Sequence, residues 1–188
     1  MKEQELASAC RKGDRAAFAT LFEEYSPMLM KVCRRYTGND NDAADVFQEG
    51  FAKIIEKFGN FEYRGEGSLK AWLVRVMMNC SVSFLRKRRR DSLIREPLEE
   101  DRLLLADSIE LDENEVSRIP DDVLLDSVTE LTPGCRTVFN MSVFEGLGHE
   151  EIGKILGIGK TASVSRLYRA RKLLAERIKE YYKKVDNV

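Results

Sequence analysis

Apolar residues recur every three or four positions through most of the first 90 residues, the spacing that lines one face of an α-helix. We expect a first helix from the capping residue Asp14 to TGNDND, a second from Asp42 to Gly59, and a third beginning at the capping residue Ser68. The apolar faces comprise Phe18, Leu21, Phe22, Tyr25, Met28, Leu29, Val32 and Tyr36, then Val46, Phe47, Phe51, Ile54, Ile55 and Phe58, and then Leu69, Trp72, Leu73, Val76, Met77 and Cys80. Residues 1–90 therefore form an all-α domain.

The helical pattern stops in residues 91–121, where acidic residues are frequent, apolar residues are sparse, and Pro97 and Pro120 occur. We interpret this stretch as a mostly flexible linker. The pattern resumes over residues 122–188 and breaks at Thr132-Pro133-Gly134 and at Gly157. Its first apolar positions are Leu124, Leu125, Val128, Leu131, Val138, Phe139, Val143 and Phe144. The expected fold class is all-α, with two small helical domains joined by a flexible acidic linker, the C-terminal one with a helix-turn-helix.

The net charge of -1 conceals three segments of alternating sign. Lys and Arg outnumber Asp and Glu by 17 to 12 in residues 1–90 and by 11 to 6 in residues 131–188. Between them, residues 91–130 carry 3 basic and 14 acidic residues. Two basic segments around an acidic connector favour binding of a polyanion, with nucleic acid the plausible class.

Several function classes have little support in the composition. Cys10, Cys33, Cys80 and Cys135 are scattered without CxxC spacing, and His149 is the only histidine. These residues argue against a zinc site and against His-based catalysis, so we expect no metal and no cofactor. The first residues are polar, and no apolar run reaches the roughly 20 residues of a membrane span, which favours a soluble cytoplasmic protein.

Residues 149–174 predict two short helices that meet at Gly157, with Gly153 at their close approach. The second helix would turn Val164, Leu167 and Ala170, or the stem of Arg171, toward the first. Its outer face would then carry Ser165, Arg166, Tyr168, Arg169 and Lys172. Such a basic helix fits the major groove of DNA, although an amphipathic hairpin with a solvated basic face has the same pattern.

Two further basic features lie in the first domain. The run FLRKRRR puts five cations at residues 86–90, where they either contact phosphates or complement the helix dipole in solvent. The loop before Trp72 combines Phe61, Tyr63 and Arg64 with two glycines. Aromatic and basic side chains suit unstacked bases. The alternative places Phe61 and Trp72 in the core.

Acidic residues Asp42, Asp45 and Glu49 share one face of the second helix. They could bind a divalent metal in a nuclease, complement the helix N-terminus, or form a protein-docking face together with Gln48. The residues alone leave these three interpretations open.

Two blocks of the sequence resemble one family in the same order. DAADVFQEGFAKIIEKFGNF with GSLKAWLVRVMMN is similar to conserved region 2 of bacterial RNA polymerase sigma factors of the extracytoplasmic-function branch. LTPGCRTVFNMSVFEGLGHEEIGKILGIGKTASVSRLYRARKLL is similar to region 4. The resemblance implies a non-enzymatic subunit that binds core RNA polymerase and promoter DNA and melts DNA without ATP. It also implies an anti-sigma factor as regulator.

The resemblance assigns each segment a role: residues 1–90 dock on core polymerase and read the −10 element, residues 91–121 connect, and residues 122–188 read the −35 element. Contacts to the polymerase clamp helices fall to Asp45, Gln48 and Glu49, with the flap as a second polymerase contact. The −10 set is Phe61, Tyr63, Arg64, Ser68, Lys70, Asn79, Arg86 and Arg88, and the loop is expected to capture a flipped base. The −35 set is Arg136, Lys160, Ser165, Arg166, Tyr168, Arg169 and Lys172.

The chain departs from the family pattern at Ser163 and Val164, where many relatives carry Val and then a basic residue. The departure leaves open whether the inward-facing position of this helix has moved by one residue. Other classes remain beside the favoured one. A stand-alone helix-turn-helix regulator would bind a palindrome without polymerase, a nuclease or recombinase would need a metal or a nucleophile, and a structural interaction protein would not bind DNA.

Overall fold

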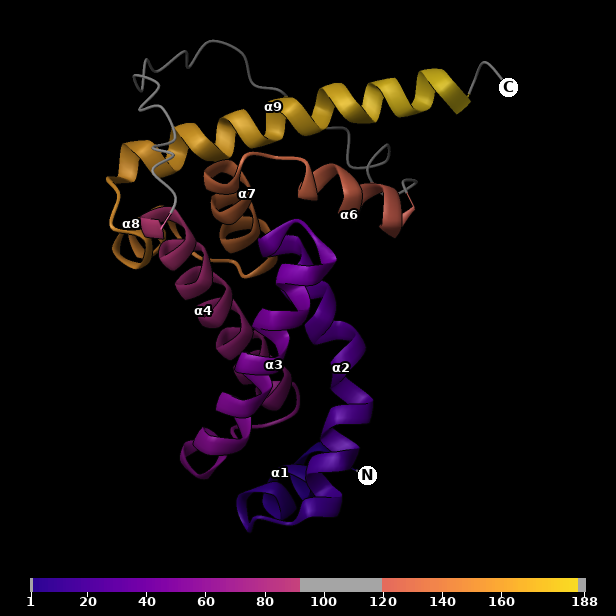
Figure 1. Cartoon of the computed structure of the whole chain (residues 1–188), viewed down its shortest axis with the longest axis vertical. Helices are drawn as coiled ribbons and strands as arrows, with labels where there is room; N and C mark the ends of the chain where they lie inside the picture. Colours follow the sequence, from indigo (N-terminus) through magenta and orange to yellow (C-terminus); the bar gives the residue numbers. More distant parts are fainter. Residues whose placement is uncertain (1, 92–119, 186–188) are drawn as a thin grey trace. The chain divides into compact units, whose positions relative to one another are not determined.

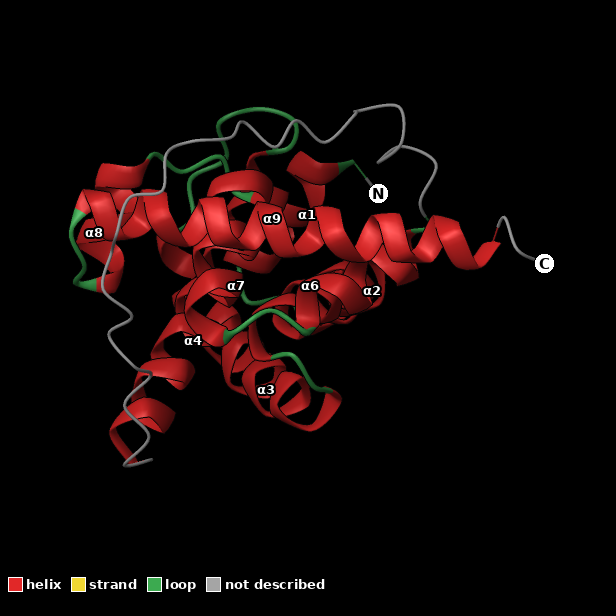
Figure 2. Cartoon of the chain, turned by 90° about the horizontal axis from the view of Figure 1, so that it is seen from above, coloured by secondary structure: helices red, strands yellow, loops and turns green. Residues whose placement is uncertain are grey.

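The computed structural model describes residues 2–91 and 120–185, and within those ranges every regular element is a helix (Figures 1 and 2). The prediction of an all-α fold is confirmed. The chain divides into two compact units, Met1–Arg90 and Asp91–Val188. Most of the predicted linker, residues 92–119, lies outside the described residues. No described helix is both long enough and apolar enough to cross a membrane.

Unit 1 contains the three predicted helices and one that the pattern did not reveal. Asp14 caps the first predicted helix, accepting a hydrogen bond from the backbone N–H of Ala16 at 2.8 Å. Gly38 ends it in the left-handed conformation, with φ 82°. The elements are α1 (Glu3–Arg11), α2 (Arg15–Thr37), α3 (Asp40–Lys57), η1 (Phe58–Asn60) and α4 (Ser68–Asp91).

The core of unit 1 depends on a close approach at Gly50, in the middle of α3. A Cβ on Gly50 would lie 2.4 Å from Sδ of Met77, a fully buried residue of α4, so the packing favours glycine unless the methionine side chain shifts. Most of the expected apolar residues are buried or half-buried. Two predictions were wrong: Phe22 is 45% exposed and Ile55 is 48% exposed, because each lies at the solvent edge of its helix stripe.

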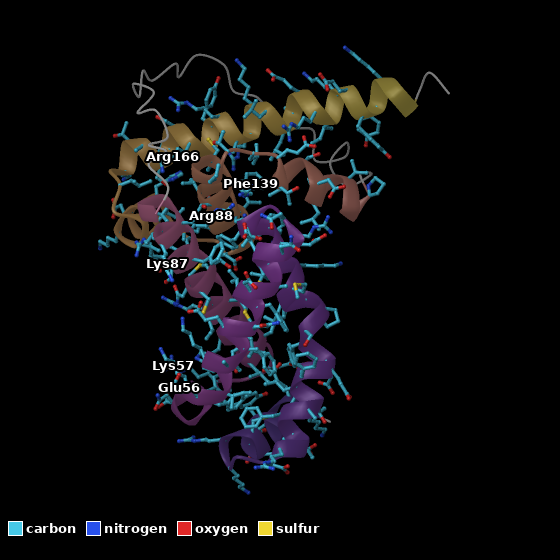
Figure 3. The ribbon with its side chains drawn as sticks, viewed as in Figure 1. Glu56, Lys57, Lys87, Arg88, Phe139 and Arg166 are labelled. Atoms are coloured by element: carbon cyan, nitrogen blue, oxygen red, sulfur yellow. The ribbon has the colours of Figure 1, made fainter. Side chains whose placement is uncertain are left out.

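A distorted helical turn in unit 2 changes which apolar residues face the core. A five-residue π-helix, η2, follows directly on α7, and its wider turn rotates the chain. Val143 and Phe144 are consequently exposed, whereas Val138 and Phe139 of α7 are buried. Figure 3 labels Phe139. The elements are α6 (Asp121–Thr129), α7 (Pro133–Phe139), η2 (Asn140–Phe144), α8 (His149–Leu156) and α9 (Lys160–Val185).

Arginine side chains attach α6 to the rest of unit 2. Arg136 of α7 is only 6% exposed, and its guanidinium donates to the backbone carbonyls of Thr129, the last residue of α6, and of Leu131 just beyond it. Arg177 of α9 donates to the carbonyl of Ser127 at 2.9 Å. Ser127 and Thr129 lie in the last turn of α6, where backbone carbonyls have no N–H donor within the helix, and the two arginines supply donors there.

The helix-turn-helix forms with the expected glycines. Gly157 ends α8 with φ 68°, and a Cβ on Gly153 would lie 2.8 Å from the carbonyl oxygen of Ile158, so the crowding comes from the turn. The predicted inward position of Val164 was wrong. Ser163 is fully buried beside Leu167 and Ala170, and its Oγ is hydrogen-bonded to Nδ1 of His149 at 2.9 Å, while Val164 is half-exposed.

Candidate nucleic-acid interface

The 61–68 loop connects η1 to α4 and is shaped by glycines and by Ser68. Gly65 and Gly67 have φ of 118° and 84°, a region that side chains rarely adopt. Oγ of Ser68 accepts from the N–H of Arg64 at 3.2 Å and donates to the carbonyl of Gly65 at 2.6 Å. Ser68 therefore stabilises the loop, and the prediction that it caps the helix was wrong. The first amides of α4 bond instead to the carboxylate of Glu3.

The aromatic residues of this loop divide between core and surface. Phe61 is 5% exposed, with its ring centroid 5.6 Å from that of Phe58 and 5.2 Å from that of Trp72. This position agrees with the core alternative. Tyr63 is half-exposed and Arg64 is exposed, its guanidinium 3.2 Å from the carboxylate of Glu62. The surface that this loop offers a ligand thus consists mainly of Tyr63 and Arg64.

Desolvation raises the pKa of the Tyr63 phenol, with smaller contributions from the carboxylates of Glu3 and Glu66. Like any tyrosine, Tyr63 is protonated at neutral pH and keeps its O–H as a hydrogen-bond donor, and the raised pKa extends this state to higher pH. A neutral ring beside the Arg64 cation can both stack on a base and donate to it.

Helix α4, which follows the loop, carries further polar and basic side chains. Lys70, Asn79 and Arg86 are all exposed. Arg75 is exposed as well and lies one helical turn before Asn79, so it shares that face, although it is not among the residues predicted from the sequence. The four-residue spacing to Asn79 was the signal that could have identified it.

The basic end of α4 is joined to the start of α3 by an ion pair. Arg88 pairs with Asp42, which also accepts from the side-chain amide of Asn39 at 2.6 Å. Figure 3 labels Arg88 and its exposed neighbour Lys87. The carboxylate of Asp42 is therefore engaged in contacts within unit 1.

Asp45, Gln48 and Glu49 form an exposed polar face on α3. Glu49 is paired with Lys53 one turn later. The same side of α3 carries exposed Ile55, and Phe22 of α2 lies near it, with its ring centroid 5.0 Å from that of Phe51. We found no group of three or more metal-ligating side chains among the described residues. An acidic face beside exposed apolar side chains suits protein docking.

On α9, the buried positions Ser163, Leu167 and Ala170 define which residues face outward. At about 100° per residue, Lys172 lies opposite this buried stripe, with Thr161, Ser165 and Tyr168 beside it. Arg166 (labelled in Figure 3) and Arg169 lie on the flanks of that face. Thr161 is exposed and was not among the predicted residues; it becomes apparent only when the inward position is assigned to Ser163.

Three predicted −35 residues have distinctive surroundings. Nζ of Lys160 lies 2.9 Å from a carboxylate oxygen of Glu150, and this bond lowers the pKa of Glu150. Oγ of Ser165 is buried and makes no hydrogen bond within the described residues. Arg136 is buried between α6 and α7, so its guanidinium is not on the surface that carries Tyr168 and Lys172.

Comparison with family models matches both units. Residues 21–91 match the model for sigma-70 region 2, and residues 121–174 match the model for sigma-70 region 4. The first match spans α3, the 61–68 loop and α4, and the second ends within α9. Helix α1 lies outside both matches.

Curated relatives match over nearly the whole chain. The ECF RNA polymerase sigma-E factor of Haemophilus influenzae is 28% identical, over 95% of this chain and 96% of the relative. The ECF RNA polymerase sigma factor SigW of Bacillus subtilis is 26% identical, over 90% and 93%. The fold is similar to that of the sigma factor RpoE from Bartonella quintana, solved with the anti-sigma factor NepR. This match has a TM-score of 0.51 and 22% identity, over 86% of this chain and 96% of that one.

Proposed function

The chain belongs to the sigma-70 family of RNA polymerase sigma factors, in the extracytoplasmic-function group, and we propose that its two units divide promoter recognition between them. It is a promoter-specificity subunit, which binds core RNA polymerase and directs transcription initiation. The observation that supports this proposal most strongly is the pair of family matches, region 2 followed by region 4 along the chain. Each match covers a unit with exposed basic side chains. We assign residues 1–90 to core docking and −10 recognition, residues 91–121 to the linker, and residues 122–188 to −35 recognition.

For core docking we propose the exposed face of Asp45, Gln48 and Glu49 on α3. Carboxylates and an amide can bond to basic and polar side chains of the polymerase clamp helices, and the neighbouring Ile55 and Phe22 offer apolar area. The Glu49–Lys53 pair is exposed, so opening it for a partner costs little.

For the −10 element we propose capture of an unstacked base by the 61–68 loop. Tyr63 and Arg64 supply a ring and a planar cation, while Asn79 and Arg86, which share one face of α4, would follow the strand. Lys70, on the first turn of α4, would add positive charge beside the loop. Phe61 and Ser68 support the loop from within. Arg88 contributes to the positive potential at the end of α4 and is held there by Asp42.

For the −35 element we propose that α9 lies in the major groove with Lys172, Tyr168 and Thr161 toward the DNA, while Ser165, whose Oγ is buried, supports this face from within. Arg166 and Arg169 on the flanks can reach a guanine edge or a phosphate. Lys160, at the start of the helix, suits a phosphate contact after leaving Glu150. For the buried Arg136 we propose a supporting role under this surface.

Binding partners follow from this function. An anti-sigma factor that covers the polymerase-facing surfaces would regulate the chain, and action with core polymerase places it in the cytoplasm. The chain itself would perform no catalysis, because the polymerase supplies the chemistry and promoter melting draws on binding energy.

The first test is capture of core RNA polymerase by the purified full-length chain at two salt concentrations, followed by transcription mapping. We expect stoichiometric capture and initiation at defined promoters. Asp45→Ala with Glu49→Ala should weaken capture while the helical content stays unchanged. Glu176→Ala with Glu180→Ala is the matched control, since it removes two exposed carboxylates with the same spacing from α9. DNA binding without core capture would instead support a stand-alone regulator.

A further inference from the structure

A carboxylate from outside the matched regions holds the start of α4. Glu3 is the first residue of α1, and the region 2 match begins only at residue 21. Its Oε2 accepts a hydrogen bond from the backbone N–H of Gly67 at 2.9 Å, and its Oε1 accepts one from that of Leu69 at 2.9 Å. One side chain therefore joins α1 to residues 64 and 66 positions further along the chain.

The bonds replace the local cap that α4 lacks. The first amides of a helix have no acceptor within the helix, and a carboxylate there gains two charge-assisted hydrogen bonds and a favourable dipole interaction. Ser68 cannot provide this cap, because its Oγ is turned toward Arg64 and Gly65. The backbone of Glu3 is held in place as well, since Leu6 on the next turn of α1 is fully buried in the core.

The 61–68 loop has few other restraints near Arg64. Gly65 and Gly67 are flexible residues with left-handed conformations, and a Cβ on either would meet no atom within 4 Å. The hydrogen bonds of Ser68 and the two bonds to Glu3 thus hold the backbone next to Arg64. Loss of Glu3 would free Gly67 and the first turn of α4, and the side chains of Tyr63 and Arg64 would sample more orientations.

We propose that Glu3 is a positioning residue that fixes the base selectivity of the 61–68 loop. This inference rests on the proposed −10 function of the loop. Selectivity among bases requires donors and rings at defined positions, whereas general attraction to DNA requires only charge. Removing Glu3 therefore reduces the preference for the correct base more than it reduces docking on core polymerase, because the docking residues lie on α3.

The experiment compares Glu3→Ala and Glu3→Gln in the full-length chain assembled with core polymerase. Open complexes are formed on a promoter library randomised across the −10 element, and base preferences are read by sequencing. Glu5→Gln is the matched control: Glu5 lies in the same turn of α1 but accepts only from the N–H of Lys2, at 3.3 Å. Arg64→Ala marks the base position that the loop reads.

We expect Glu3→Ala to lower the preference at the Arg64-dependent position by about fivefold, with core affinity unchanged. Glu3→Gln should show a smaller loss, because its carbonyl oxygen can still accept one bond, and Glu5→Gln should match the unaltered protein. In the free protein, hydrogen exchange at Gly67 and Leu69 should accelerate in both Glu3 variants while the buried Leu73 amide stays protected.

Unchanged base preferences in both Glu3 variants, even with slower overall initiation, would overturn the proposal and leave Glu3 a purely structural cap. Unchanged exchange at Gly67 and Leu69 would also overturn it, because the two bonds would then not restrain the loop. If Arg64→Ala leaves every preference intact while Glu3→Ala alters them, the proposed function of the loop fails independently of Glu3.

Discussion

Replacement of Arg136 by alanine should unfold unit 2 more easily without disturbing unit 1. The guanidinium is buried and donates to the carbonyls of Thr129 and Leu131, the second at 3.3 Å. A hydrogen bond with a charged donor contributes about 1.5–3 kcal/mol, and the longer bond adds less, so we expect a loss of about 2–4 kcal/mol in the free energy of unfolding. This loss is a large part of the roughly 5–15 kcal/mol that stabilises a typical domain.

Denaturant unfolding of the full-length chain can separate the two units. The only tryptophan, Trp72, lies in unit 1, so its fluorescence reports that unit, whereas hydrogen exchange in α7 reports unit 2. Arg136→Ala should lower protection in α7 and leave the Trp72 transition in place. Arg166→Ala is the control on the surface of α9 and should change stability by less than about 0.5 kcal/mol while weakening DNA binding.

Normal protection of α7 in Arg136→Ala, together with a uniform loss of DNA affinity, would refute this account. Arg136 would then act through its charge on DNA, as its place in the family pattern implies. Arg136→Lys sharpens the distinction, because lysine keeps the charge but replaces the longer guanidinium with a compact ammonium on a shorter side chain, which fits the two carbonyls less well.

Two further predictions concern the core of unit 1. Gly50→Ala should destabilise unit 1 by about 1–2 kcal/mol in unfolding monitored by Trp72 fluorescence, because the new methyl group meets Sδ of Met77. Gly59→Ala is the control and should have little effect, since its methyl group would meet no atom within 4 Å. Equal unfolding transitions in the two variants would contradict this prediction. Burial raises the pKa of the Cys33 thiol to about 12, so at pH 8 only about one part in ten thousand is thiolate, and alkylation should be slow until urea unfolds the chain. Because the folded state holds the thiol proton more tightly than the unfolded state, the contribution of Cys33 to stability is present below about pH 9 and is lost as the pH rises toward 12. Rapid alkylation of the native protein would contradict the burial of this thiol.

Helices and caps were predictable because their causes are local. The three-to-four spacing located α2, α3 and α4, and Asp14, Gly38 and Gly157 ended or began helices as their backbone chemistry requires. Helix α1 escaped notice because it is short and buries only a few residues. The exposure of Phe144 was also unpredictable, since a π-helix changes the angular spacing that periodicity assumes.

The candidate surfaces were predictable as segments but not as sets of contacts. Exposed basic residues follow from helical phase, yet long-range partners do not follow from spacing. The bonds from Glu3 to Gly67 and from Arg136 to Thr129 join parts of the chain whose separation no local rule relates. A sequence pattern treats Glu3 and Arg136 as charged surface residues. In the folded chain, each side chain instead forms hydrogen bonds with backbone groups at a helix end.

The phase of α9 shows how one such partner changes a functional prediction. A serine at the inward position should be unfavourable in an apolar interface, which made a shift toward Val164 plausible. His149 removes that penalty by bonding to Oγ of Ser163, so the inward stripe continues through Leu167 without a shift. With the phase fixed in this way, the outward face centres on Lys172 and includes Thr161, and Arg166 moves to its flank. The lone histidine thus determines which side chains α9 presents to the −35 element in our proposal.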